Sequence, residues 1–359
     1  ICKLDPNANF IWAKSMGSNS GEEGLSIAID NMGSVYTTGF ISDTTDFDPS
    51  TNVFNLFASG LNNIFISKLD VNGIFVWAKS IGNTEPCRGS AIAVDGLGKT
   101  YVTGYFQGTV DFDPGAGNLN INANGEDIFI VKLDTIGDFI WAKSMGGGNA
   151  DKGFAIAADA LGNVYSTGVF EGTADFDPNG GTFNLTAQFV RDMFICKLDN
   201  GGNLVWAKNI TGSVGLSEGN DIVVDAFENI YTTGFYYGTV DFDFNSGIDN
   251  HVTIGAQDFF VMKIDQLPTN VESISYDDAF LVFPNPSNGI INIQNLSDAG
   301  KEKTNLTVND INGNEVVKLD DIFNQNLNYK LSLSNYAKGI YLLKINTNSK
   351  SFYKKFVVM

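Results

Sequence analysis

Hydrophobic and polar residues alternate along the chain in short runs that Gly, Asn and Asp close, a pattern that predicts strands rather than helices. One stretch contains four such runs, at 127–134, 138–145, 154–160 and 163–170. Asp and Gly residues separate the runs, as in tight hairpin turns, because Asp can bond backbone N–H groups ahead of it and Gly accepts a positive φ. Since no window of ten residues here shows a helical period, we predict an all-β region.

The four runs belong to a repeat. Four tryptophans, each in a Trp-Ala-Lys triplet, are spaced by 65, 64 and 65 residues: Trp12, Trp77, Trp141 and Trp206. A Thr-Gly pair, an Asp-Phe-Asp triplet and a Lys-(Leu/Ile)-Asp triplet recur in the same phase. Four features with one period indicate a tandem array of one supersecondary unit over residues 1–265.

Four antiparallel strands in a unit of about 64 residues are typical of one blade of a β-propeller. The segments Lys-Leu-Asp-x-x-Gly-x-x-x-Trp-Ala-Lys-Ser and Asp-x-x-Gly-x-x-Tyr-x-Thr-Gly resemble the bacterial seven-bladed-type β-propeller repeats. The resemblance implies a propeller-like array of four-stranded blades and no particular activity. Because each blade in such an array is covered by its neighbours, we expect the tryptophans to be buried between adjacent blades.

The strands do not fill whole blades when they are counted by type, with A for Ile-Ala-Val-Asp, B for Tyr-x-Thr-Gly, C for Lys-Leu-Asp and D for Trp-Ala-Lys-Ser. The chain reads C-D, then A-B-C-D three times, then A-B-C, giving four to five blades with the first and last incomplete. The next tryptophan is due near residue 271 and is missing. Either the strand of Trp12 completes the last blade, or further blades precede Ile1. We favour a fragment of a larger ring, because a spare strand would leave an unpaired edge.

The repeat stops at Gln266, and residues 266–278 form a polar, proline-bearing segment that we expect to be a linker. Residues 279–359 then show six or seven alternating runs typical of half-buried antiparallel strands, which predicts a small β-sandwich. Pro284 and Pro286 favour an extended backbone before the first of these strands, and Gly289 permits a turn. Without a family, an accessory binding sandwich would be the favoured interpretation.

This segment resembles the type A C-terminal sorting domain of the type IX secretion system of the Bacteroidetes. The motif residues occur in the family's order: Pro284, Asn285, Pro286, Gly289, Gly313, Gly339 and Tyr341. The chain departs from the family at Met359, where a lysine is usual. The resemblance implies passage through the periplasm to the cell surface or the medium. It also implies two partners, the secretion machinery and a sortase-like peptidase that cuts within 268–278.

Charge and composition exclude several classes of function. The formal net charge is −19, so the surface repels nucleic acid and anionic lipid. A single histidine, His251, excludes a His-ligated metal cluster and disfavours a Ser-His-Asp triad. The three cysteines, Cys2, Cys87 and Cys196, are spaced too widely to indicate a disulfide framework or a zinc knuckle. No apolar run is long enough for a transmembrane helix.

The Asp-Phe-Asp triplets place two carboxylates on one side of an extended chain. Two copies resemble the first half of a calcium loop, with oxygen-bearing side chains at positions one, three and five: Asp175, Asp177, Asn179, Asp241, Asp243 and Asn245. None of the copies supplies a Glu at position twelve. We favour the alternative, a structural turn whose carboxylates cap backbone N–H groups, and expect no other cofactor.

An active site in a propeller normally combines different residues from different blades, but here the carboxylates are repeated. The residues that break the repeat, His251, Arg88, Arg191 and Tyr236-Tyr237, are expected to lie scattered over connections. We therefore expect a non-catalytic surface or secreted binding module for a glycan or a protein. The alternative is a secreted polysaccharide-degrading enzyme whose catalytic part lies upstream.

Overall fold

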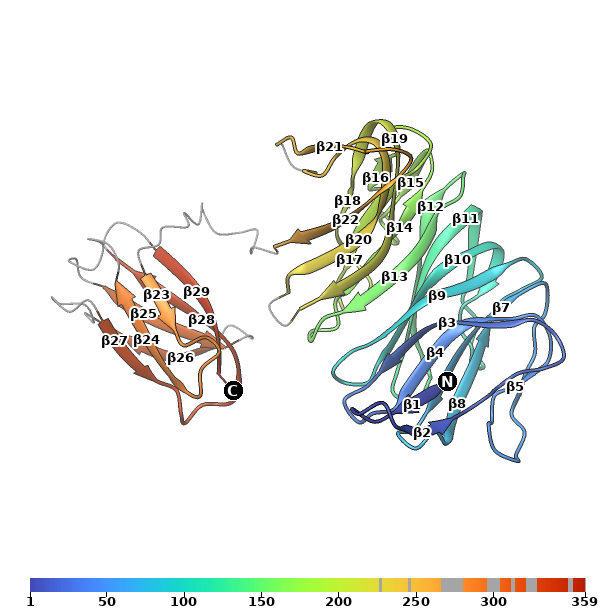
Figure 1. Ribbon diagram of the computed structural model, residues 1–359, viewed down its shortest axis with the longest axis horizontal. Coiled ribbons are helices and arrows are strands. Elements are labelled where there is room, and N and C mark those ends of the chain that lie inside the picture. The colour runs from blue at the N-terminus through green and yellow to red at the C-terminus, as the bar shows by residue number, and fades with distance from the viewer. Residues whose placement is uncertain are drawn as a thin grey trace. The chain divides into compact units, whose positions relative to one another are not determined.

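The computed structural model describes residues 1–225, 228–244, 247–265, 280–295, 304–310, 314–320, 328–347 and 351–358. These residues form strands, turns and connections (Figure 1), and they contain no helix with the length and hydrophobicity to cross a membrane. The chain divides into two compact units, Ile1–Gln266 and Leu267–Met359. The expected linker at 266–278, with the place of the missing tryptophan, lies outside the described residues.

Three consecutive sheets of the first unit each contain four antiparallel strands that are hydrogen-bonded in chain order, and a small hairpin, β15 (Thr173–Asp175) with β16 (Asn184–Thr186), extends the second sheet beyond its fourth strand. The three sets of four strands are β3 (Glu22–Ile29), β4 (Val35–Ile41), β7 (Asn63–Leu69) and β8 (Phe75–Ile81); β9 (Cys87–Val94), β10 (Thr100–Asp111), β11 (Asn120–Leu133) and β12 (Phe139–Gly147); and β13 (Lys152–Ala158), β14 (Val164–Phe170), β17 (Asp192–Leu198) and β18 (Leu204–Asn209). The strands of each sheet are thus of types A, B, C and D in that order.

Shorter assemblies stand before, between and after these sheets. The strands β1 (Cys2–Leu4) and β2 (Phe10–Ala13) form a hairpin, and β19 (Thr211–Val224), β20 (Ile230–Asp241), β21 (Asn250–Val252) and β22 (Asp258–Ile264) form the last sheet. The Asp-Phe-Asp segments lead into small hairpins, β5 (Thr45–Asp46) with β6 (Asn55–Leu56) and β15 (Thr173–Asp175) with β16 (Asn184–Thr186). Among the described strands, β2 pairs with β1 and does not complete the last sheet.

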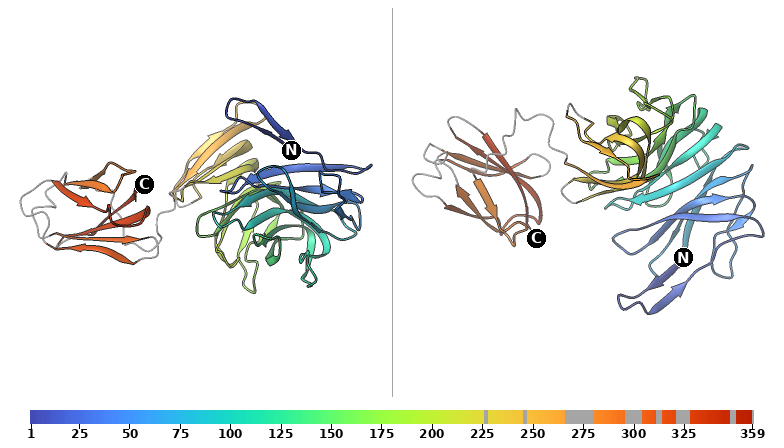
Figure 2. Two further views of the ribbon diagram at one scale, coloured as in Figure 1. Left: turned by 90° about the horizontal axis from the view of Figure 1, so that it is seen from below. Right: turned by 45° about the horizontal axis from the view of Figure 1, so that its top comes forward.

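The first strand of each sheet packs against the preceding sheet, so that the sheets follow one another through the unit (Figure 2). A glycine in this strand permits the close approach. A Cβ atom on Gly89 would lie 2.4 Å from Thr38 Oγ1 of the sheet before, and one on Gly153 would lie 2.3 Å from Thr103 Oγ1. The recurrent Gly and Thr are therefore sheet-packing residues, because a side chain at the glycine would force the sheets apart.

The other recurrent polar residues hold each sheet together. In the second sheet, the Tyr101 hydroxyl donates a 2.9 Å hydrogen bond to Asp95, whose other oxygen accepts the N–H groups of Leu97 and Lys99 in the turn. The Lys132 ammonium lies 4.8 Å from the Tyr101 ring centroid. The same Tyr–Asp bond occurs in the other sheets, at Tyr36–Asp30, Tyr165–Asp159 and Tyr231–Asp225. The repeat motif is thus explained by turn closure and packing.

The tryptophans lie less deeply than expected. Trp77 is buried, whereas Trp12, Trp141 and Trp206 are half-buried. They lie in the last strand of their units, and the rings of Trp141 and Trp206 pack against hydrophobic cores while staying partly exposed. The Trp12 indole points its Nε1 at the carbonyl of Val71, 3.4 Å away. The expected burial between blades is therefore wrong for three of the four rings.

The second unit contains two antiparallel sheets around one apolar core. The first is β23 (Phe280–Phe283), β24 (Ile290–Asn295) and β27 (Asn328–Ser332); the second is β26 (Glu315–Leu319), β25 (Asn305–Asp310), β28 (Gly339–Asn346) and β29 (Ser351–Val358). Both sheets contribute buried residues, and the rings of Phe280 and Phe352 meet across the core with centroids 5.0 Å apart. The unit is a small β-sandwich.

Candidate functional site

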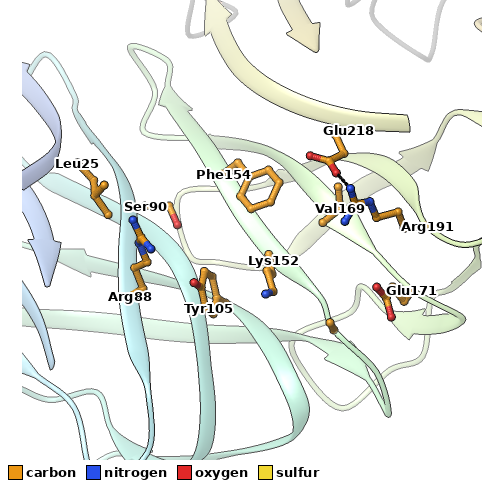
Figure 3. Close-up of a pocket in the computed structure, with 11 residues that line it drawn as sticks. Leu25, Arg88, Ser90, Tyr105, Lys152, Phe154, Val169, Glu171, Arg191 and Glu218 are labelled. Carbon is orange, nitrogen blue, oxygen red and sulfur yellow. Dashed lines mark ion pairs between the residues drawn. The ribbon is translucent and has the colours of Figure 1, made fainter. Parts of the chain in front are cut away.

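A pocket of about 440 Å³ lies in the first unit, near the start of the first strands of consecutive sheets (Figure 3). Its wall includes residues from β3, β9, β13 and β19: Leu25, Arg88, Lys152, Phe154 and Glu218. In Figure 3, Lys152 and Phe154 are seen between Arg88 and the pair formed by Arg191 and Glu218. The pocket therefore forms only where several sheets stack, since no single repeat contains all of its residues.

Both arginines of the chain, Arg88 and Arg191, line this pocket. They are 103 residues apart in the sequence and belong to different repeats. The expectation that the repeat-breaking residues lie on connections is confirmed for Arg191, which directly precedes β17, and is wrong for Arg88, which lies within β9. The two arginines are not scattered, because both line one cavity. The expectation is also wrong for Tyr236-Tyr237 in β20 and His251 in β21, which lie in strands and are not among the residues that line the pocket.

Each cation at the pocket forms an ion pair with a carboxylate of a neighbouring sheet. The pairs are Arg88 Nη2 with Glu23 Oε2 at 3.2 Å, Lys152 Nζ with Glu126 Oε2 at 2.7 Å, and Arg191 Nη2 with Glu218 Oε1. Positive and negative side chains therefore balance here, although the whole chain carries a formal charge of −19. The pocket is a mixed set of hydrogen-bond donors and acceptors rather than a cationic patch.

The position that bears these charges is equivalent from sheet to sheet. It directly precedes the glycine of the first strand, and it holds Glu23, Arg88, Lys152 and Glu218. The glycine itself is the same in all four copies. The repeat thus keeps the residue that the packing requires and varies the residue before it, which lines the pocket in three of the four copies: Arg88, Lys152 and Glu218.

A β-bulge follows the same glycine in every first strand. The register skips one residue in each, which leaves Leu25, Ser90, Phe154 and Asn220 without a partner in the ladder. Three of these four, Leu25, Ser90 and Phe154, line the pocket. Bulges re-aim side chains and are common beside functional sites. Sequence reasoning missed this feature, because a bulge is visible only in the register between two strands.

Aromatic rings complete the wall. The Tyr105 ring lies under Lys152, with Nζ 4.6 Å from the ring centroid, and Phe154 is half-buried. Phe154 is the only aromatic residue among the four bulge residues. The pocket therefore offers flat apolar surface beside its charged groups.

Two buried aspartates lie near the pocket: Asp151 directly precedes Lys152 of the lining, and Asp127 directly follows Glu126, the ion-pair partner of Lys152. Asp151 is fully buried and accepts the N–H groups of Gly147 at 2.6 Å and Glu171 at 3.1 Å. Asp127 is 8% exposed, and its Oδ1 has no hydrogen-bond partner among the described atoms. Burial raises the pKa of each carboxyl to about 6, and the charge of Asp127 further raises the pKa of Asp151. Asp151 thus holds the backbone of Glu171, which lines the pocket.

The calcium candidates lie in turns away from the pocket wall. Asp175 Oδ1 accepts the N–H groups of Asp177 at 3.0 Å and Phe183 at 2.8 Å, and Asp177 Oδ1 accepts that of Asn179 at 3.0 Å. The Asn179 side-chain oxygen accepts a 2.6 Å bond from Lys143. These bonds are those of a capped turn. No group of three or more His, Cys, Asp or Glu side chains suited to a metal occurs among the described residues.

The second calcium candidate repeats this arrangement. Asp241 Oδ1 accepts the N–H groups of Asp243 at 3.0 Å and Asp249 at 2.8 Å, whereas Asn245 lies outside the described residues. Calcium binding at either turn stays a prediction.

The sorting-motif residues hold the last strand of the second unit. In the segment from Pro284 to Pro286, Asn285 Oδ1 accepts the Val357 N–H at 2.9 Å, and Asn285 Nδ2 donates to the Lys355 carbonyl at 3.2 Å. One asparagine side chain thus bonds two backbone groups of β29, as a neighbouring strand would.

The remaining motif residues shape the two sheets. Gly289 has φ of +93°, a conformation that favours glycine, at the turn into β24. Gly339 begins β28, and the buried Tyr341 stacks on Phe356 with centroids 5.8 Å apart. Gly313 lies outside the described residues.

Two curated proteins are similar in sequence to the chain. The uncharacterized WD repeat-containing protein L264 of Acanthamoeba polyphaga mimivirus is 25% identical over 266 residues, which are 65% of this chain and 19% of that protein. The regulatory protein FlaEY of Caulobacter vibrioides is 29% identical over 165 residues, 45% of this chain and 17% of that protein. The chain therefore spans less than a fifth of the length of either relative.

Similarity to solved structures is weak. The latent PorU of Porphyromonas gingivalis is 9% identical with a TM-score of 0.19, covering 94% of this chain and 32% of that one. A Bacteroides vulgatus protein with an immunoglobulin-like β-sandwich fold is 18% identical with a TM-score of 0.20, covering 23% of this chain and 85% of that one. Both scores are too low to indicate a shared fold.

Residues 281–359 match the family described as the secretion system C-terminal sorting domain. The match covers the β-sandwich and the motif residues that hold β29. It confirms the predicted localisation. The protein therefore carries a type IX secretion sorting domain at residues 281–359 and is secreted or displayed on the cell surface.

Proposed function

We propose that the protein is an exported, non-catalytic binding module whose repeats are blades of a β-propeller and whose ligand is a glycan or a protein. The observation that carries the proposal is the pocket. Its charged and bulge residues differ from copy to copy, while the glycines, threonines and tyrosines that build the sheets recur. A cavity whose lining residues differ among the copies, set in a regular frame, is suited to ligand recognition.

The two end faces of the array support the propeller arrangement. Ile27 in the first sheet is 55% exposed, whereas the equivalent Ile92 and Ile156 in the next sheets are 5% and 7% exposed. At the other end, Phe259 in β22 is 82% exposed, and the equivalent Ile128 is fully buried. Both end faces therefore expose apolar residues at positions that are buried between sheets inside the array. We propose that further sheets of the same repeat cover them, as in a ring of blades.

The recurrent carboxylates support a non-catalytic role. The first Asp of every Asp-Phe-Asp triplet accepts two backbone N–H groups of its own turn: Asp46, Asp111, Asp175 and Asp241. At the pocket, Glu218 is paired with Arg191. The most abundant acidic groups thus serve the structure. The proposed partners are the secretion machinery and its sortase-like peptidase, besides the ligand.

The proposal is tested by screening the purified protein on a glycan array and against proteins of the same cell surface. The same polysaccharides are incubated with the protein and assayed for new reducing ends. We expect binding without turnover. Polysaccharide cleavage by the chain would contradict the non-catalytic assignment, and the absence of any bound glycan or protein would contradict the binding role.

A further inference from the structure

We infer that the pocket between β3, β9, β13 and β19 binds a neutral saccharide unit. The inference rests on the proposed binding role and adds to it the site and the chemical class of the ligand. The wall combines ion-paired cations, carboxylates and aromatic rings in a space of about 440 Å³, which lies within the usual range for small-ligand sites.

The charges at the pocket disfavour an anionic ligand. Arg88, Lys152 and Arg191 are matched by Glu23, Glu126 and Glu218. Glu171 adds a further negative charge to the lining. The surrounding protein is strongly acidic, with a formal charge of −19 for the chain, and repels polyanions. A neutral ligand adds no further charge to this site.

Hydroxyl groups fit the hydrogen-bonding groups that the ion pairs leave available. A guanidinium has five N–H donors, and the ion pairs of Arg88 and Arg191 each engage Nη2. Arg191 Nε is buried and has no partner among the described atoms. A hydroxyl both accepts and donates, so neighbouring hydroxyls on one ring can accept from a guanidinium and donate to its paired carboxylate. Saccharides present such hydroxyls around a rigid ring.

The apolar part of the wall suits the C–H face of a sugar ring. Tyr105 and Phe154 line the cavity, and the bulge in β13 frees Phe154 from the strand ladder. An amphipathic ligand with a flat apolar face and a polar edge matches an aromatic ring set beside charged groups. The bulge residue in the last sheet, Asn220, is exposed and does not belong to the lining, so it provides a matched control.

The test is calorimetric titration of the full chain with neutral cello-, xylo-, manno- and galacto-oligosaccharides. Oligogalacturonate and an acidic peptide form parallel arms. We expect at least one neutral oligosaccharide to bind. Phe154→Ala and Arg191→Lys should each raise its Kd at least about tenfold, and Asn220→Ala should leave it unchanged. Ser90→Trp, which fills the cavity and leaves the ion pairs in place, should abolish binding, with the melting temperature of every variant reporting the fold.

Three results would overturn the inference: no neutral saccharide bound at millimolar concentration, binding by the uronate or the peptide alone, or saccharide binding that the three pocket variants leave unchanged. The last two would leave the proposed binding role intact, because the ligand would then be of another class or bind elsewhere. Cleavage of the oligosaccharide during the titration would instead contradict the proposed function.

Discussion

The indole Nε1 of Trp141 donates a 3.0 Å hydrogen bond to the carbonyl of Asn200, in the turn between the third and fourth strands of the next sheet. Lys132 Nζ reaches the same carbonyl at 3.0 Å. Gly202 completes the contact, since a Cβ there would lie 3.3 Å from the Trp141 ring. This turn of the third sheet is therefore held by two side chains of the second sheet.

Trp141→Ala should lower the free energy of unfolding by about 2–3 kcal/mol, since the half-buried ring loses its packing and its hydrogen bond. Trp141→Phe should cost about 1 kcal/mol, because most of the packing remains. Urea denaturation measures both values. A cost below about 0.5 kcal/mol for the alanine variant would show that the ring does not join the sheets.

Gly153→Ala should destabilise the protein by more than about 2 kcal/mol, because the new Cβ would meet Thr103 Oγ1 at 2.3 Å and push two sheets apart. The matched control is Gly24→Ala. Gly24 holds the same place in the first sheet, and a Cβ there has nothing within 4 Å, since its face is uncovered. Thermal unfolding should separate the two variants, and equal melting temperatures would contradict the packing role of the glycine.

The pH dependence of the free energy of unfolding should reflect the protonation of Asp127 and Asp151. Their pKa values of about 6 in the folded state exceed the ordinary 3.8, so the folded protein binds more protons than the unfolded chain between these values. This pair therefore contributes stability that grows as the pH falls from 7 to 5 and is lost as the pH rises through 6. Other carboxyls, such as Asp199, have a lowered pKa and act in the opposite direction.

Asp127→Asn isolates the effect. It removes a buried charge and should raise the free energy of unfolding at pH 7.5 by on the order of 1 kcal/mol, with a smaller gain at pH 5. Urea midpoints at the two pH values measure this difference. A variant that is less stable than the parent at both pH values would show that Asp127 is needed as a charged hydrogen-bond acceptor.

Replacing Phe259 and Val261 with Glu should reduce concentration-dependent association of the chain. Both side chains belong to the uncovered face of the last sheet, where they are 82% and 71% exposed. An apolar face of this kind associates in water unless it is covered. Leu97→Glu is the control, because Leu97 is 71% exposed in a turn outside that face. Sedimentation velocity that shows no difference between the two variants would contradict the covered-face interpretation.

Asn285→Ala should weaken the sorting domain and lower export, because the hydrogen bonds to Val357 and Lys355 that hold β29 are lost. Asn285→Asp keeps the acceptor for the Val357 N–H and should retain part of the function. The secreted fraction of a reporter fused to residues 267–359 measures export, and limited proteolysis measures the order of the strand. Full export of a variant whose β29 is cleaved more readily would contradict this prediction. It would show that export does not depend on the stability of this strand.

Strand order and motif roles could be predicted from the sequence because they depend on local patterns. The Tyr-x-Thr-Gly and Lys-Leu-Asp segments each contain the hydrophobic and polar pattern of a strand. The turn that Asp95 closes is formed by residues close to it in the chain. The pocket could not be predicted. Its residues meet only through sheet stacking, and the bulges that place Ser90 and Phe154 depend on the register of a partner strand. The depth of Trp141 likewise depends on the next sheet.

The bulge position in the first strand of each sheet has a consequence for how this protein can evolve. The bulge position has no residue opposite it in the ladder, and it holds residues as different as Leu, Ser, Phe and Asn: Leu25, Ser90, Phe154 and Asn220. Duplication of the repeat supplies further positions of this kind, each free to mutate on its own. Such a scaffold can acquire a new specificity by single substitutions that leave the strand ladder unchanged.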